Sequence, residues 1–376
     1  MSKIEELIEK LCPDGVKYKN IEELCEISRG KVMSKEFIKS NVGEYPVYSS
    51  QTENNGELGK ISTYDFDGEY LTWTTDGANA GSVFYRKGKF SVTNVCGLLD
   101  IKSRIMIPKF LYYTLSIEAP KYVNAGMGNP KLMSNVMAKI RVAVPPLEVQ
   151  CEIVHILDDF TLLSALLSAE LSARQRQYEY YRNKLLNVRG EIRNLGSIAE
   201  FGTGSKPNNI IENFDSDLYE YINAGTTNSG YVKNTNRRNN AVTTPSRGQG
   251  GIGFVGYQEN DFWLGPLCYA IYPKDENVLN SKYLYYELMS KKDEILKRKN
   301  TGGVPSLNGC DLKTIPINVP NIEEQNKIVN ILDKFYKICN DLKEGLPAEI
   351  EKRQKQYEYY RDKLLNFKEV EEDVQV

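Results

Sequence analysis

The sequence predicts a mixed α/β protein of the α+β kind, built from two similar units in tandem that each carry a long helix. The first observation is a repeat: residues 176–187 read R-Q-Y-E-Y-Y-R-N-K-L-L-N, and residues 355–366 read K-Q-Y-E-Y-Y-R-D-K-L-L-N. Two nearly identical segments so far apart indicate a tandem duplication. The second observation is that helical patterns at 107–118 and 280–298 follow short aromatic strands and Gly, Asn, Ser and Thr turns. Each unit therefore contains helices and strands.

The duplication extends upstream of the repeated phrase. Residues 144–160 and 319–335 share Val-Pro, Gln, Ile-Val, Ile-Leu-Asp and Phe at the same spacing. The interval between the copies then grows by four residues, which is about one helical turn. Residues 31–105 show no convincing match to residues 205–280. The sequence therefore predicts two similar frames with two different contents.

Each repeated phrase is predicted to end a long helix. In the first copy, apolar residues recur in alternating steps of four and three from Ile153 to Leu185, which is the heptad pattern of a coiled coil. Pro145 and Glu148 mark its beginning, because proline suits the first turn and a carboxylate favours the positive helix end. Two such helices in one chain most simply pack on each other. The residues expected at their seam are Leu167, Leu171, Tyr178, Tyr181, Leu185, Leu346, Ile350, Tyr357, Tyr360 and Leu364.

The second long helix carries an interruption. Its heptad pattern contains two successive steps of four around Leu346, with Gly345 and Pro347 beside it. Because glycine and proline disfavour the interior of a helix, we expect a break or kink here. A continuous, underwound helix is the alternative.

The first long helix contains a short internal repeat, in which Leu-Ser-Ala recurs every four residues between Leu163 and Ala173. Each such unit adds about 6 Å to a helix, so the stretch could set a distance. The plain alternative is a good helix-forming run with a leucine stripe.

The repeated phrase also places aromatic side chains away from the seam. Tyr180 and Tyr359 stand at equivalent positions, beside Gln177 and Gln356. Exposed aromatic residues at duplicated positions suggest that two copies of one partner dock there. The alternative is that these tyrosines cover the adjoining globular domain.

The composition bounds the class of protein. The net charge of −2 argues against a protein that coats nucleic acid by charge alone, although local basic patches stay possible. The seven cysteines form no C-x-x-C pair, which is typical of reduced thiols in a cytosol. Neither a signal peptide nor a long apolar span is recognisable, so we expect a soluble, cytoplasmic protein.

We find no catalytic or metal-binding set in the sequence. His155 is the single histidine, which excludes histidine-based zinc clusters and disfavours catalytic triads. Residues 251–256 fit G-x-G-x-x-G, but no helix pattern follows them, as dinucleotide binding requires. The loop that an adenine methyltransferase needs around its flipped base is also absent. The chain therefore has the character of a binder and organiser.

Basic and amide residues gather locally in both units, where they could contact phosphates and base edges. A solvated charged face is the alternative for each cluster. The DNA-binding candidates are Lys60, Thr74, Asn79, Arg86, Lys87, Lys89, Lys131, Lys206, Lys233, Arg237, Arg238, Arg247, Gln249 and Lys299.

The duplicated helical motifs carry a family resemblance over the full length of the chain. The P-P-L-E-x-Q-x-x-I-V-x-x-L-D start at residues 145–158, the Q-Y-E-Y-Y-R-x-K-L-L end and their repetition resemble the specificity subunit of a type I restriction–modification system. The resemblance implies two target-recognition domains related by pseudo-two-fold symmetry, each reading one half of a split DNA target. It also implies two antiparallel spacer helices. Four-residue repeats in the first helix of this family set the gap between half-sites, which favours the distance-setting interpretation of Leu163–Ala173.

The resemblance further implies partners. Two methyltransferase subunits and, in the full complex, two restriction subunits would join this chain on double-stranded DNA, without a membrane. S-adenosylmethionine, ATP and Mg²⁺ would belong to those partners, and adenine N6 would be methylated after base flipping. The chain itself would not be an enzyme. A stand-alone methyltransferase or nuclease, and an interaction scaffold without DNA binding, are the alternatives.

The domain boundaries follow from the repeats. We expect a first target-recognition domain at 1–145, a first spacer helix at 146–190 and a second recognition domain at 191–319. A second spacer helix and C-terminal tail would occupy 320–376.

Overall fold

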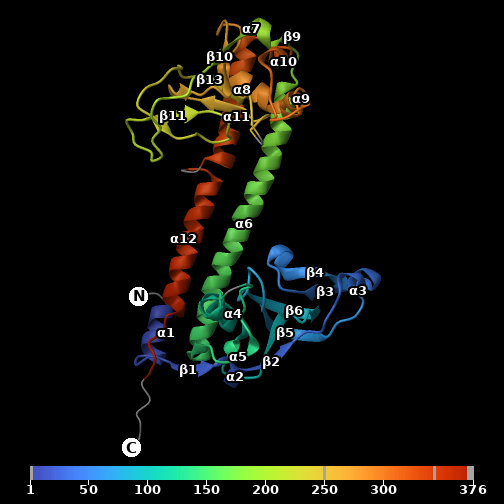
Figure 1. The fold of residues 1–376 in the computed structure, drawn as a ribbon. Coiled ribbons are helices and arrows are strands. Elements are labelled where there is room, and N and C mark those ends of the chain that lie inside the picture. Colours follow the sequence, from blue (N-terminus) through green and yellow to red (C-terminus); the bar gives the residue numbers. More distant parts are fainter. Residues whose placement is uncertain (1–2, 127, 249–250, 342–343, 371–376) are drawn as a thin grey trace, which may run out of the picture. The chain divides into compact units, whose positions relative to one another are not determined.

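A computed structural model describes residues 3–126, 128–248, 251–341 and 344–370. The chain forms two compact units. The first combines the residues up to Leu166 with those from Glu351 onward, and the second runs from Leu167 to Ile350. In Figure 1 the first unit therefore joins blue and green ribbon to the red end of the chain.

The first unit holds a six-stranded sheet in the order β2-β7-β5-β6-β3-β4, and a two-stranded sheet of β1 and β8. Among the described strands of this unit, β3 and β6 pair in parallel and the other pairings are antiparallel. Its strands are β1 Lys17–Asn20, β2 Cys25–Arg29, β3 Val42–Tyr48, β4 Glu57–Ile61, β5 Phe66–Thr74, β6 Val83–Val92, β7 Cys96–Ile101 and β8 Arg141–Val144. Its helices are α1 Lys3–Leu11, α2 Ile21–Leu24, α3 Lys35–Ser40, η1 Glu53–Gly56, α4 Pro108–Glu118, η2 Ala119–Tyr122 and α5 Ser134–Met137, with the first part of α6 Leu147–Leu186 and most of α12 Leu346–Leu365.

The second unit holds a four-stranded antiparallel sheet, β10-β16-β13-β14, a three-stranded sheet, β12-β11-β15, and a β17–β9 pair. Its strands are β9 Glu191–Asn194, β10 Ala199–Thr203, β11 Tyr219–Ile222, β12 Tyr231–Val232, β13 Ala241–Pro245, β14 Gly256–Gln258, β15 Trp263–Leu264, β16 Cys268–Pro273 and β17 Pro316–Val319. Its helices are the rest of α6, α7 Leu195–Ile198, α8 Ser281–Ser290, α9 Lys292–Lys297, α10 Gly309–Lys313 and α11 Ile322–Asn340.

The two units share more than the sequence predicts. The strand order β2-β7-β5-β6 in the first sheet corresponds to β10-β16-β13-β14 in the second. Cys96 and Cys268 begin equivalent strands, both are buried, and each thiol contacts the carbonyl oxygen of the next residue. The expectation of two wholly different contents is therefore wrong for these strands. A buried strand needs only apolar and β-branched residues, so its sequence can diverge while its place in the sheet persists.

The long helices pair within each unit. In the first unit the ring of Phe160 on α6 stacks on Tyr360 of α12, with centroids 5.7 Å apart. In the second unit Tyr181 of α6 stacks on Phe335 of α11, with centroids 5.6 Å apart. Phe160 and Phe335 are equivalent residues of the two copies, and so are Tyr181 and Tyr360. The same pair of positions therefore meets in both units, each time between different copies, so the paired helices run antiparallel.

The predicted seam residues differ in burial. Tyr178 and Leu364 are buried, and Tyr360 remains 37% exposed. The half-buried members are Leu167, Leu171, Tyr181, Leu185, Leu346, Ile350 and Tyr357.

The second copy is interrupted, as Gly345 and Pro347 suggest. Helix α11 ends at Asn340 and α12 begins at Leu346. The N–H of Gly345 donates to the carbonyl of Asp341, and a Cβ on Gly345 would lie 2.6 Å from that oxygen. The four extra residues of this copy thus fall beside a break between two helices, and the continuous-helix alternative is wrong.

One buried glutamine ties each long helix to its sheet domain. In the first unit Gln150 donates to the carbonyls of Ile105 and Pro145, each at 2.8 Å, and accepts from the N–H of Ile107. In the second unit Gln325 donates to Val278 and Pro320, each at 2.8 Å, and accepts from the N–H of Asn280. Both glutamines are fully buried. Each joins the start of a long helix to the segment that enters α4 or α8.

We expect Gln150→Leu and Gln325→Leu to destabilise their units by about 3 kcal/mol each, because buried backbone groups lose their partners. Differential scanning calorimetry would show a lower unfolding temperature. Gln356→Leu, at an exposed position of α12, is the matched control and should change little. A Gln150→Leu or Gln325→Leu variant that unfolds at the wild-type temperature would contradict this role of the glutamine.

Candidate functional site

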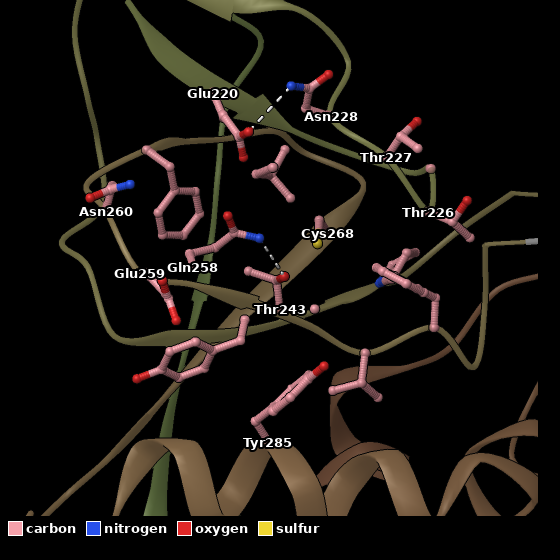
Figure 2. Close-up of a pocket in the computed structure, with 18 of the residues that line it drawn as sticks. Glu220, Thr226, Thr227, Asn228, Thr243, Gln258, Glu259, Asn260, Cys268 and Tyr285 are labelled. Atoms are coloured by element: carbon pink, nitrogen blue, oxygen red, sulfur yellow. Dashed lines mark hydrogen bonds between the residues drawn. The ribbon is translucent and has the colours of Figure 1, made fainter. Parts of the chain in front are cut away.

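The second unit contains a cavity of about 1240 Å³. It lies among strands β13 and β14, the loops that follow β11 and β14, and helix α8. Figure 2 shows Tyr285 reaching it from the helix, while Glu220, Asn228, Gln258 and Asn260 surround it from strands and loops. The cavity is therefore bounded partly by loops that differ between the two units and partly by strands and a helix that both units share.

Its wall carries hydrogen-bonding side chains that are mostly uncharged. Asn228 Nδ2 donates to Glu220 Oε1 at 3.4 Å, and Gln258 Nε2 donates to Thr243 Oγ1 at 3.2 Å (Figure 2). The other hydroxyl, amide and charged side chains of the lining are Ser216, Thr226, Thr227, Asn239, Glu259, Asn260, Asp261, Lys282 and Lys292. Amide, hydroxyl and carboxylate groups can donate hydrogen bonds to base edges or accept them. The wall thus offers both donors and acceptors to a polar ligand.

Aromatic rings line the side next to the helices. Tyr285 lies 5.6 Å from Tyr257, 5.0 Å from Tyr286 and 6.4 Å from Tyr336, measured between ring centroids. Burial raises the pKa of Tyr257 and Tyr285, because the phenolate would lose its hydration. These hydroxyls therefore stay protonated at neutral pH. Tyr285 and Tyr286 are only 6% and 0% exposed, so these rings support the wall by packing on one another.

The basic candidates of the second unit are not among the cavity-lining residues that the structure describes. Arg237 donates to the carbonyl of Thr203, and Arg238 forms an ion pair with Glu276 at 3.5 Å. Both arginines are thus partly engaged within the domain, and Gln249 lies outside the described residues. The exposed or half-buried candidates are Lys206, Lys233, Arg237, Arg238, Arg247 and Lys299.

The candidates of the first unit divide by burial. Lys87 forms an ion pair with Glu69 at 2.8 Å. Thr74 and Arg86 lie on strands rather than loops and are only 0% and 3% exposed, so neither offers a surface contact in this arrangement. The exposed members are Lys60, Asn79, Lys87, Lys89 and Lys131.

The repeated helix surface is the same in both copies. Tyr180 and Tyr359 are 62% and 64% exposed. Each lies edge-on to the following tyrosine, with centroids 5.4 Å apart and planes at 76°. The neighbouring Gln177 and Gln356 each accept a hydrogen bond from an arginine three residues earlier in the helix. The structure therefore presents one surface twice.

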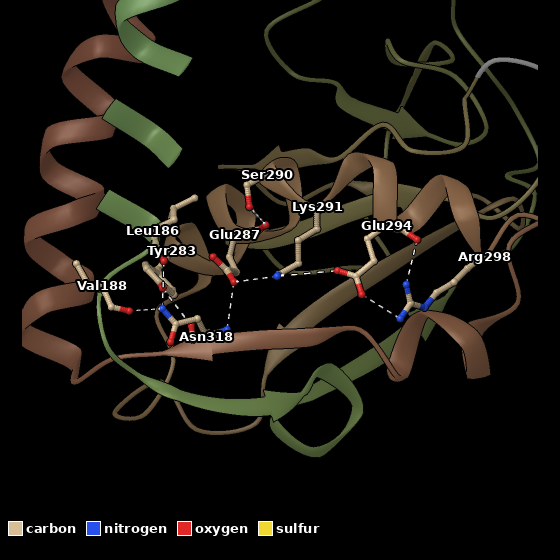
Figure 3. Close-up of polar contacts among 9 residues, drawn as sticks. All are labelled: Leu186, Val188, Tyr283, Glu287, Ser290, Lys291, Glu294, Arg298 and Asn318. Carbon is tan, nitrogen blue, oxygen red and sulfur yellow. Dashed lines mark hydrogen bonds and ion pairs between the residues drawn. The ribbon is translucent and has the colours of Figure 1, made fainter. Parts of the chain in front are cut away.

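A polar network found in the second unit holds the end of α6. Asn318 on β17 donates through its side chain to the carbonyls of Leu186 and Val188, and its N–H donates to the buried carboxylate of Glu287 (Figure 3). Lys291 lies 3.5 Å from that carboxylate. Burial raises the pKa of Glu287, since the charged form loses hydration, while the Asn318 N–H and Lys291 act in the opposite direction.

The raised pKa of Glu287 predicts how the stability of the protein depends on pH. The folded protein holds a proton on Glu287 at a higher pH than the unfolded chain does, so this group's contribution to stability grows as pH falls and is lost as pH rises through the raised pKa. We expect the unfolding temperature of the wild type, relative to Glu287→Gln, to rise from neutral to mildly acidic pH. Thermal melts across that range test this.

The matched control is Glu212→Gln, because Glu212 is exposed. Its difference from the wild type should stay nearly constant with pH. A constant difference for Glu287→Gln as well would contradict the buried-carboxylate interpretation.

No group of three or more His, Cys, Asp or Glu residues in the described part of the chain could hold a metal ion. No described helix is long and apolar enough to cross a membrane.

Comparison with known proteins identifies the family. Residues 13–173 and 187–352 match the family described as type I restriction modification DNA specificity domain. A protein of Mycoplasma pneumoniae named as a type I specificity subunit is 37% identical over 360 residues, covering 92% of this chain and 96% of the relative. The specificity subunit of the type I restriction enzyme MpnII from the same species is 48% identical over 171 residues, covering 44% of this chain and 52% of the relative.

A solved structure shares the fold. The crystal structure of the S subunit of a type I restriction–modification system from M. genitalium superposes with a TM-score of 0.65 at 18% identity, covering 93% of this chain and 95% of that one. The chain therefore belongs to the type I restriction–modification specificity subunits. It carries two DNA-specificity domains and is a component that assembles with other subunits of such a system.

Proposed function

We propose that the two units read the two halves of a split DNA sequence. The duplicated frame supports this most. Each unit has the buried glutamine with its backbone hydrogen bonds and the same order of four strands, while the loops and edge strands around them differ. Equivalent supports with different surfaces suit two different recognition tasks. The domains at 1–145 and 191–319 would supply the readers. The first helix at 146–190 and the second helix, which shares 320–376 with the C-terminal tail, would supply the spacer.

The chain is the non-catalytic component of the complex, and the cofactors reside on the methyltransferase and restriction subunits. We infer that two methyltransferase subunits and two restriction subunits assemble with it on double-stranded DNA in the cytoplasm. In this arrangement S-adenosylmethionine, ATP and Mg²⁺ bind to the partner subunits. Methylation or cleavage by the purified chain alone would favour the enzyme alternative instead.

We infer that the Leu-Ser-Ala repeat at Leu163–Ala173 sets the gap between half-sites. The stretch lies inside the continuous helix α6, which runs for 40 residues. A helical insertion there lengthens the spacer without changing either sheet domain.

Adding one four-residue Leu-Ser-Ala-Glu unit should widen the preferred gap, because it adds about 6 Å, or roughly two base pairs. Both half-sites should stay the same. Methylation sequencing of DNA from cells that also express the partner subunits reports half-sites and gap together. Ser168→Ala keeps the length and is the control, and an unchanged gap after the insertion would refute the distance-setting role.

We infer that the duplicated surface of Gln177, Tyr180, Gln356 and Tyr359 seats one methyltransferase subunit at each copy. The two tyrosines are the most exposed aromatic residues of the repeated phrase, and their geometry is identical. Partly exposed tyrosines supported by a second ring are typical anchors of protein interfaces.

The single variants Tyr180→Ala and Tyr359→Ala should each weaken binding of one methyltransferase subunit by about tenfold or more. The unfolding temperature should change little, because both side chains are exposed. Surface plasmon resonance with the methyltransferase subunit measures the loss, and Tyr122→Ala at an exposed position of the first unit is the control. Full affinity in the double variant would place the docking surface elsewhere.

A further inference from the structure

Strand register makes Arg86 and Gln258 equivalent residues. On the central strands, Thr72 pairs with Phe84 on one side and Leu98 on the other. Thr243 pairs in the same way with Gly256 and Ala270. Leu98 and Ala270 are each the third residue of their strand, so the two threonines correspond. Arg86 and Gln258 each stand two residues beyond the pairing partner of that threonine.

The equivalence includes a hydrogen bond. Arg86 Nε donates to Thr72 Oγ1 at 3.1 Å. Gln258 Nε2 donates to Thr243 Oγ1 at 3.2 Å, as Figure 2 shows. Each domain therefore holds one long polar side chain in place through a threonine on the neighbouring strand. Holding a side chain by one bond while its other end stays available is how a recognition residue is preorganised.

The far end of Arg86 is only partly satisfied within the domain. Its guanidinium carbon lies 3.6 Å from the ring centroid of Tyr48 and 4.5 Å from that of Phe84. Nη1 is buried and has no hydrogen-bond partner among the described residues. Burial lowers the pKa of Arg86, and no described carboxylate pairs with it. A buried donor without an acceptor is unfavourable, which suggests a ligand that supplies one.

The pair of residue types indicates what that ligand is. Both side chains can donate hydrogen bonds to a phosphate, but the neutral amide in the second unit brings no positive charge to such a contact. The property that both positions share is directed hydrogen bonding from a fixed side chain. Arginine pairs with guanine O6 and N7, and glutamine pairs with adenine N6 and N7. The exchange of Arg for Gln is thus an exchange of base preference.

We propose that Arg86 and Gln258 are the corresponding specificity-determining residues of the two domains, with Arg86 reading a guanine and Gln258 an adenine. This inference rests on the proposed DNA-reading function. Gln258 is half-buried and lines the open cavity. Arg86 is 3% exposed beneath the segment that ends at Gly56, whose Cβ position lies 2.9 Å from Nη2. Reading of a base by Arg86 therefore requires residues 49–56 to move away from its guanidinium.

The test uses the full chain assembled with its partner subunits, in the variants Arg86→Gln and Gln258→Arg. Methylation sequencing should show one guanine of one half-site replaced, with adenine preferred, in Arg86→Gln, and the reverse exchange in the other half-site for Gln258→Arg. Affinity for the original target should fall by about 5- to 150-fold. Lys39→Gln, at an exposed position of α3 in the same unit, should leave the recognised sequence unchanged.

The possible outcomes distinguish a wrong assignment of these two residues from a wrong proposed function. Unchanged half-sites in both variants overturn the assignment. An equal loss for every sequence, with a salt slope smaller by about one, would identify a phosphate contact and also overturn it. A wild-type complex without sequence preference would refute the proposed function itself. Should Arg86→Gln fail to fold in thermal melts, Arg86→Lys and Gln258→Ala decide, because loss of base preference supports the assignment and an unchanged preference overturns it.

Discussion

The glutamine at the start of each long helix is the constraint on which the rest of this structure depends. In the first unit its amide makes three hydrogen bonds to backbone groups, which belong to the start of α6 and to the segment that enters the earlier helix α4. An amide has both donors and acceptors, so one side chain can satisfy all of these buried groups at once. The same arrangement recurs in the second unit. Each sheet domain is therefore fixed to its own helix by the same device.

Around this fixed frame the two units are free to differ. The four-stranded core is common, but in the first unit β3 and β4 extend the sheet, whereas the second unit has a separate three-stranded sheet and a large cavity. The second unit also has the Glu287–Asn318 network, where the equivalent residues of the first unit are Thr114 and Ala143. The family assignment gives this asymmetry a meaning, because a specificity subunit gains from two readers that differ on supports that do not.

Much of the fold could be predicted from the sequence. The near-identical phrases at 176–187 and 355–366 indicated duplication, and the heptad steps indicated paired helices. The interruption at Gly345 and Pro347 also followed from residue types alone, since glycine and proline disfavour helix interiors. The burial of Arg86 did not follow, because a basic residue in a diverged strand has the same local pattern whether it faces solvent or the core. Gln150 and Gln325 were visible as a repeated letter, but nothing local revealed their burial.

The sequence by itself determined the duplication, the helices, the break and the family, because those depend on periodicity and on motifs that local chemistry constrains. Only the tertiary structure decided that the diverged interiors share four strands in one order, and that Arg86 and Gln258 are equivalent. The reason is that strand pairing joins residues distant in sequence through backbone hydrogen bonds, which do not depend on side-chain identity. Register, burial and the cavity emerge from that pairing.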